Sequence, residues 1–262
     1  MDKVSSKEIA QMIDVSLLNP VMTEKDIIEG CEIAKKYDAV SICVKNCFVE
    51  KSYDLLKDTG VKVTTVISFP HGSCLTDVKV FEAIRAVEQG CVEVDMVLNI
   101  GQLLGGGYDY VEKEIRAVAD AMHERGALLK VILENAYLTD ELIIKASKLS
   151  ESAGADFIKT STGYATGGAT IPNLRLMRES VSDRIQIKAA GGVRTLDAAL
   201  NVRALGVSRF GCTATAKIME EAFKREAAGN LRLPESVGDD LQGIYDPEFA
   251  AAAESAEKNP GY

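Results

Sequence analysis

Eight short apolar segments recur along the chain, each followed by a longer segment with apolar residues at helical spacing. The apolar segments predict strands at 13–17, 40–44, 61–67, 92–98, 128–133, 156–160, 185–189 and 209–211. The segments between them predict helices at 23–37, 48–57, 76–89, 108–125, 139–153, 173–181, 195–205 and 215–227. Because the strands are apolar on nearly every residue, they are expected to be buried on both faces, as in a parallel sheet.

This number of strand–helix units favours a closed (β/α)8 TIM barrel over an open doubly wound sheet. The first clear strand is not followed by the glycine pattern of a dinucleotide-binding sheet. We therefore expect an α/β fold with a single catalytic barrel domain at 1–228, including an extra N-terminal helix. The pattern fades in 229–262, which predicts a C-terminal extension, partly helical at 247–258.

The composition excludes several classes of function. A net charge of -9 argues against a nucleic-acid surface, which needs clustered Lys and Arg. The chain has neither a long apolar run that predicts a membrane span nor a signal-peptide pattern at its N-terminus, so we expect a cytoplasmic protein. Two histidines and six scattered cysteines do not form a metal-binding motif, so we expect no metal and no cofactor.

Charged residues interrupt four of the predicted strands. Asp95, Lys130, Lys159 and Lys188 lie in otherwise apolar segments, and Glu134 follows one of them. Isolated charges in buried strands are costly unless they are paired. We expect these side chains to converge near the mouth of the barrel, where catalytic residues project. A structural network of ion pairs would give the same pattern.

Glycine-rich turns after the last strands favour the catalytic interpretation. The turn at 189–195 contains two glycines and Arg194, and a second turn follows at 211–215. Glycines let the backbone approach a ligand closely, and the N–H groups at a helix start attract anions. Phosphate commonly binds between the loops after strands seven and eight of such barrels.

A lysine next to a phosphate site suggests carbonyl chemistry. A lysine that attacks a carbonyl must be neutral, and burial and a neighbouring cation favour the neutral amine. We expect Lys159 to be the nucleophile and Lys188 to supply the cation. Asp95 is then placed to move protons. We expect Lys130 and Glu134 to orient Asp95 or Lys188 from a second layer.

Seven segments resemble the deoxyribose-phosphate aldolase family, and they occur in the family's order at 13–18, 41–44, 69–72, 93–98, 129–134, 155–163 and 187–194. The resemblance implies a metal-free Schiff-base (class I) aldolase. It also implies reversible cleavage of 2-deoxy-D-ribose 5-phosphate to D-glyceraldehyde 3-phosphate and acetaldehyde.

The resemblance implies that Lys159 forms the Schiff base and that Asp95 and Lys188 relay protons. The family holds phosphate at positions matching Gly163, Gly191, Gly192, Val193, Arg194 and Gly211. Four other residues fall in matching segments and are expected to contact substrate: Asp14, Ser16, Cys43 and Thr162. Ser16 replaces the usual Thr, and Thr213 is the expected source of a phosphate-binding hydroxyl.

Some members of the family end in a tyrosine that reaches the substrate, and this chain ends in Tyr262 after a longer tail. A homo-oligomer such as a dimer is compatible with the sequence. Two alternatives to the deoxyribose reaction stay open from the residues alone. One is a Schiff-base aldolase for another phosphorylated sugar, and the other is a barrel that binds a phosphosugar without covalent chemistry.

Overall fold

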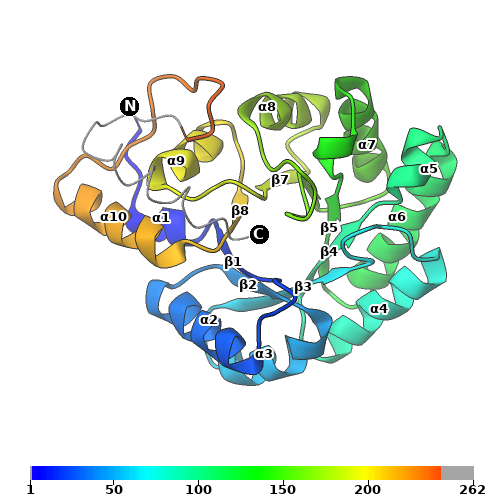
Figure 1. The fold of residues 1–262 in the computed structure, drawn as a ribbon, viewed down its shortest axis with the longest axis horizontal. Helices are drawn as coiled ribbons and strands as arrows, with labels where there is room; N and C mark the ends of the chain where they lie inside the picture. The colour runs from blue at the N-terminus through cyan, green and yellow to red at the C-terminus, as the bar shows by residue number, and fades with distance from the viewer. Residues whose placement is uncertain (1, 243–262) are drawn as a thin grey trace.

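The computed structural model describes residues 2–242, in which parallel strands close into a barrel (Figure 1). Each strand pairs with the next one in the sequence, and the last pairs with the first. The strands are β1 Ile13–Leu17, β2 Ser41–Val44, β3 Lys62–Ile67, β4 Glu93–Val97, β5 Leu128–Ile132, β6 Phe157–Lys159, β7 Gln186–Ala189 and β8 Arg209–Cys212. The predicted (β/α)8 barrel is therefore confirmed.

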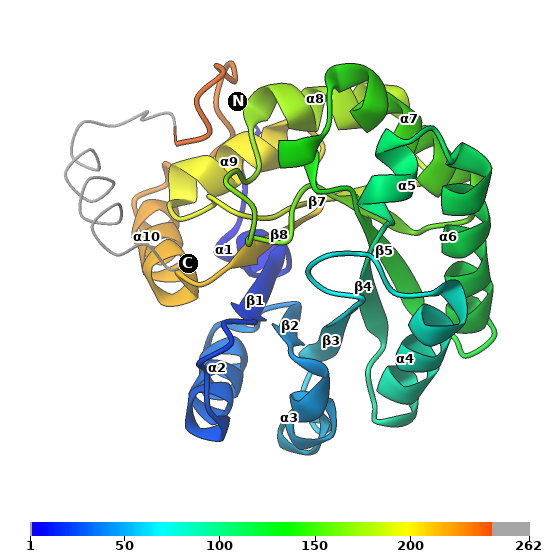
Figure 2. The same ribbon diagram turned by 45° about the vertical axis from the view of Figure 1, so that its right-hand side comes forward.

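The helices cover the outside of the barrel (Figure 2). They are α1 Ser6–Ala10, α2 Glu24–Tyr37, α3 Val49–Leu56, α4 Thr76–Glu88, α5 Ile100–Leu104, α6 Tyr108–His123, α7 Asp140–Ser152, α8 Ile171–Ser180, α9 Leu196–Ala204 and α10 Thr215–Ala227. Two 3-10 turns, η1 Asn46–Phe48 and η2 Asn135–Tyr137, follow β2 and β5. Helix α1 is the expected N-terminal helix, whereas α5 was not predicted because it is too short to show a helical period.

Side-chain oxygens fix where several helices begin. In α2, Asp26 accepts hydrogen bonds from the backbone N–H of Thr23 at 2.6 Å and from its hydroxyl at 2.7 Å. In α9, the Thr195 hydroxyl accepts a hydrogen bond from the N–H of Ala198 at 3.1 Å. The second of these caps matters for function, because it fixes the end of a glycine turn at the mouth of the barrel.

The strands separate an apolar outer core from a polar interior. Leu129 and Val131 of β5 belong to the apolar core formed with the helices, whereas Lys130 between them does not. Asp95 alternates in the same way with Val94 and Met96 in β4. Since successive side chains of a strand point to opposite faces, the charged residues face the barrel interior.

The described part of the C-terminal extension packs on the barrel. The N–H of Val4 donates to the carbonyl of Leu231 at 3.2 Å, and Lys3 forms an antiparallel bridge with Arg232. The division at residue 228 stays a prediction. The helix predicted at 247–258 and Tyr262 lie outside the described residues. Across 2–242, no helix combines the length and apolar character that crossing a membrane requires.

Candidate active site

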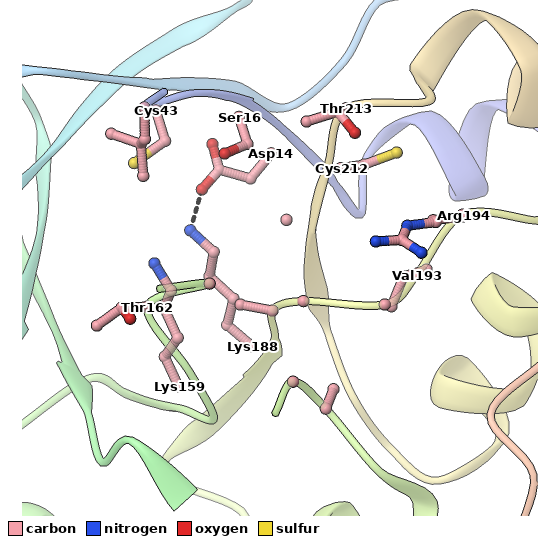
Figure 3. Close-up of a pocket in the computed structure, with 18 of the residues that line it drawn as sticks. Asp14, Ser16, Cys43, Lys159, Thr162, Lys188, Val193, Arg194, Cys212 and Thr213 are labelled. Carbon is pink, nitrogen blue, oxygen red and sulfur yellow. Dashed lines mark hydrogen bonds and ion pairs between the residues drawn. The ribbon is translucent and has the colours of Figure 1, made fainter. Parts of the chain in front are cut away.

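A cavity of about 310 Å³ lies at the carboxyl ends of the strands, lined by β1, β2, β6, β7, β8 and the loops after the last three (Figure 3). Active sites of such barrels lie at this end. Lys159 and Lys188 line the cavity. So does each residue expected to bind substrate, namely Asp14, Ser16, Cys43, Thr162, Gly163, Gly191, Gly192, Val193, Arg194, Gly211 and Thr213.

One buried carboxylate joins three lysines beneath this cavity. Oδ2 of Asp95 accepts hydrogen bonds from Nζ of Lys159 at 2.8 Å and from Nζ of Lys188 at 2.7 Å. Its Oδ1 accepts from Nζ of Lys130 at 2.9 Å. The strand register explains this convergence, because Asp95 lies opposite Lys130 and Lys159 lies opposite Lys188. Asp95 itself is fully buried and does not line the cavity.

The three lysines differ in how many carboxylates neutralise them. Lys188 also contacts Asp14, and Lys130 also contacts Glu93 at 2.7 Å. Within residues 2–242, Lys159 forms its single ion pair with the shared carboxylate. Lys159 is therefore the least neutralised of the three, and it lines the cavity as well.

The ion pairs fix the charges of the surrounding groups. Burial disfavours the Asp95 carboxylate, but the three lysines outweigh burial and hold its pKa well below the ordinary value. Burial also disfavours the Lys188 ammonium, yet Asp14 and Asp95 raise its pKa above the ordinary value. At neutral pH, a carboxylate and a cation thus flank Lys159.

The other end of the cavity presents a backbone turn and a cation. Figure 3 places Arg194 and Thr213 away from the two lysines, on the β7 and β8 loops. Gly191 and Gly192 adopt φ angles of 78° and 101°, a region that favours glycine. Within the described part of the chain, the N–H groups of 191–194 have no hydrogen-bond partner. They are therefore available to an anion in the cavity.

Comparison with known proteins identifies the family. The model of the DeoC/LacD family aldolases matches residues 8–211. This chain belongs to that family. The deoxyribose-phosphate aldolase of Thermoanaerobacter sp. strain X514 is 50% identical over 214 residues, which cover 81% of this chain and 96% of that protein. That of Thermococcus kodakarensis is 47% identical over 221 residues, covering 84% and 99%.

Solved structures agree with this DeoC/LacD family assignment. A putative deoxyribose-phosphate aldolase from Coccidioides immitis matches with a TM-score of 0.81 and 39% identity, covering 85% of this chain and 88% of that one. A deoxyribose-phosphate aldolase from Aeropyrum pernix, described as tetrameric, matches with a TM-score of 0.77 and 30% identity, covering 84% and 92%. The resemblance inferred from the sequence segments is confirmed.

Glu134 of this aldolase does not contact Asp95 or Lys188, which corrects the expectation that it orients them. It follows β5 with φ of 57°, and this backbone conformation turns it toward the next loop. Its carboxylate accepts the N–H of Thr162 at 3.3 Å and contacts the Thr162 hydroxyl. Glu134 therefore orients the loop after β6, whereas Lys130 contacts Asp95 directly.

The sequence reasoning missed part of the cavity wall. Thr166, Gly167 and Gly168, in the loop after β6, line the cavity of the aldolase. A Cβ on Gly168 would lie 2.5 Å from the carbonyl oxygen of Gly191, so a side chain there would displace the turn after β7. The signal was present in the sequence as paired glycines close after Lys159.

Three potential metal ligands lie together in the site. Donor atoms of Asp14, Cys43 and Asp95 lie within 4.8 Å of one another. The Lys188 ammonium contacts both carboxylates, so a side-chain cation already neutralises them. Burial and the two carboxylates raise the pKa of the Cys43 thiol to about 11, so it stays protonated at neutral pH. The donor set thus fits a lysine ammonium better than a metal ion.

Proposed function

We propose that this aldolase reversibly cleaves 2-deoxy-D-ribose 5-phosphate to D-glyceraldehyde 3-phosphate and acetaldehyde, with Lys159 as the Schiff-base residue. The substrate follows from the relatives, which are named deoxyribose-phosphate aldolases. The choice of lysine rests on one observation. Among residues 2–242, Lys159 faces the cavity with a single carboxylate partner, whereas Lys130 and Lys188 each have two.

The imine forms without a net proton change. Lys159 passes a proton to Asp95 and attacks the C1 aldehyde of the open-chain sugar, which gives a carbinolamine. Lys188 protonates the departing hydroxyl, which leaves as water, and Asp95 returns its proton to Lys188. Both amines reach the same oxygen of Asp95, at 2.8 and 2.7 Å, so this route needs no movement of the backbone.

Carbon–carbon cleavage uses the imine as an electron acceptor. The C2–C3 bond breaks as the C3 hydroxyl loses its proton, and its electron pair forms an enamine on Lys159. Glyceraldehyde 3-phosphate leaves, a proton is returned to C2, and water releases acetaldehyde and the free lysine. One proton is therefore stored between the two steps, and we assign its storage to Lys188 and Asp95.

The phosphate binds at the opposite end of the cavity. We assign it to the N–H groups of Gly191, Gly192 and Val193, with Arg194 and Thr213 beside them. Backbone N–H groups and a guanidinium fit a dianion well. Anchoring this end holds the sugar aldehyde toward Lys159, which favours attack by proximity.

Borohydride trapping with acetaldehyde tests the central assignment. Reduction should leave one ethyl group on Lys159, identified by peptide mapping and mass spectrometry. Lys159→Leu is the matched negative control, because Leu fills a similar apolar volume without an amine. An adduct on Lys130 or Lys188 instead would refute the choice of lysine. A panel of other sugar phosphates tests the substrate.

Two broader proposals accompany this function. We infer a cytoplasmic location, supported by six free cysteines, four of them buried. We also infer a homo-oligomer, since the Aeropyrum pernix aldolase is described as tetrameric. Sedimentation of the purified chain measures the oligomeric state.

A further inference from the structure

The C-terminal segment, defined here as residues 230–242, runs back along the barrel to the loop after β7. In Figures 1 and 2 its orange ribbon lies beside α9. Arg175 of α8 forms an ion pair with Asp239 at 2.8 Å. The Asn201 side chain of α9 donates to the carbonyl of Leu241 at 3.1 Å, and Leu241 is buried. The end of the segment is thus fixed by two helices.

Gln242 contacts the phosphate turn, defined here as residues 190–194. Its side-chain N–H donates to the carbonyl of Gly192, and its side-chain oxygen accepts from the Thr195 hydroxyl at 3.2 Å. Leu241 lies against the same glycine, since a Cβ on Gly192 would be 3.1 Å from its Cδ2. A single amide therefore links the middle of the turn to the cap of α9.

These contacts decide where the N–H groups of the turn point. In a trans peptide, the carbonyl and the following N–H point in opposite directions. The carbonyls of Ala190 and Gly191 both accept from the N–H of Ala169, at 3.0 and 2.8 Å. The carbonyl of Gly192 accepts from Gln242. Because the N–H of Val193 follows this carbonyl in the same peptide, the contact between Gln242 and Gly192 sets the direction of the Val193 N–H.

We infer that Gln242 is a positioning residue that holds the phosphate turn in its anion-binding conformation. This inference rests on the proposed function, since it needs the phosphate to bind there. Gly192 has φ of 101° and no side chain, so its own conformational preference fixes the turn only weakly. The hydrogen bonds of Gln242 to Gly192 and Thr195 supply the conformational constraint that Gly192 itself lacks.

Two substitutions separate the contacts of this residue. Gln242→Ala removes both hydrogen bonds. Gln242→Glu keeps an acceptor for Thr195 but loses the donor to Gly192. Glu235→Ala, at an exposed position of the same segment, is the matched control. All are made in the full chain and compared on 2-deoxyribose 5-phosphate, on 2-deoxyribose, and by calorimetry with inorganic phosphate.

Both Gln242 variants should lose about 3- to 10-fold in kcat/KM for the phosphorylated sugar, the value of one hydrogen bond. Their kcat/KM for 2-deoxyribose should stay unchanged, and their affinity for inorganic phosphate should fall by a similar factor. Glu235→Ala should behave like the unsubstituted chain. An equal loss on both sugars, or no loss of phosphate affinity, would overturn the positioning role.

The borohydride trap with acetaldehyde separates this inference from the proposed function. Acetaldehyde carries no phosphate, so adduct formation at Lys159 should be the same in the Gln242 variants, which also shows that they fold. Absence of the adduct in the unsubstituted chain refutes the proposed chemistry. Calorimetry with phosphate still tests the turn in that case, because it needs no turnover.

Discussion

Replacing Asp95 by Asn removes the charge that holds three lysines together. At about 2.8 Å and an effective dielectric near 20, each contact corresponds to about 6 kcal/mol of Coulomb attraction before desolvation is subtracted. Lys130 and Lys188 keep a second carboxylate, Glu93 and Asp14, but Lys159 keeps none within the described residues. The Lys159 ammonium would thus be buried without a carboxylate partner, which predicts a loss of about 3–5 kcal/mol in the free energy of unfolding.

Equilibrium unfolding in urea measures this loss. At pH 7 the Asp95→Asn chain should unfold at a clearly lower urea concentration with the same slope. Asp120→Asn, at an exposed carboxylate of α6, should change little. A loss below about 1 kcal/mol would refute this account of the network.

Three further predictions follow from the same geometry. Lys159→Leu should abolish cleavage with little change in the urea midpoint, and normal turnover would exclude Lys159 as the nucleophile. Lys130 and Arg209 outweigh burial and lower the pKa of Glu93 to about 2. The contribution of Glu93 to stability is therefore complete above about pH 4.3 and is lost on acidification towards pH 2. The thermal unfolding midpoint of Glu93→Gln should accordingly depend less on pH across that range than that of the unsubstituted chain. Gly191→Ala should raise KM for the phosphorylated sugar about 10-fold. A φ of 78° is strained for a residue with a side chain, and the added Cβ would lie 2.9 Å from Cα of Gly168. An unchanged KM would show that the turn can move to accommodate the methyl group.

The fold could be predicted because each strand–helix unit carries its own signal. Apolar runs and helical periodicity can be recognised in one sequence without an alignment, and eight strand–helix units are compatible with few fold architectures. Helix α5 was missed because a five-residue helix depends on one cap, in which Asn99 accepts the N–H of Gln102 at 3.1 Å. Such a short element depends on local hydrogen bonds more than on periodicity.

The site residues could be listed from the sequence, but their partners could not. A charged residue in an apolar strand indicates that an oppositely charged partner exists, but the register of the neighbouring strands determines which residue that partner is. Glu134 shows the difference, since it was expected beside Asp95 or Lys188, whereas its φ is 57° and its carboxylate contacts Thr162. The contacts of the C-terminal segment could not be predicted either, because no sequence motif links Gln242 to a turn 50 residues earlier.

We propose that the pairing of charges, rather than composition, selects the lysine that reacts. Lys130, Lys159 and Lys188 are all single lysines in buried strands, and the sequence does not show how many carboxylates each one contacts. In the part of the barrel that the structure describes, Lys130 and Lys188 each contact two carboxylates and are stabilised as cations, whereas Lys159 contacts one carboxylate oxygen, which it shares with Lys188. A nucleophile must give up its proton, so the lysine with the weakest ion pairing is the one suited to attack. We therefore propose that the network that stabilises the interior leaves Lys159 as the lysine that reacts at the cavity.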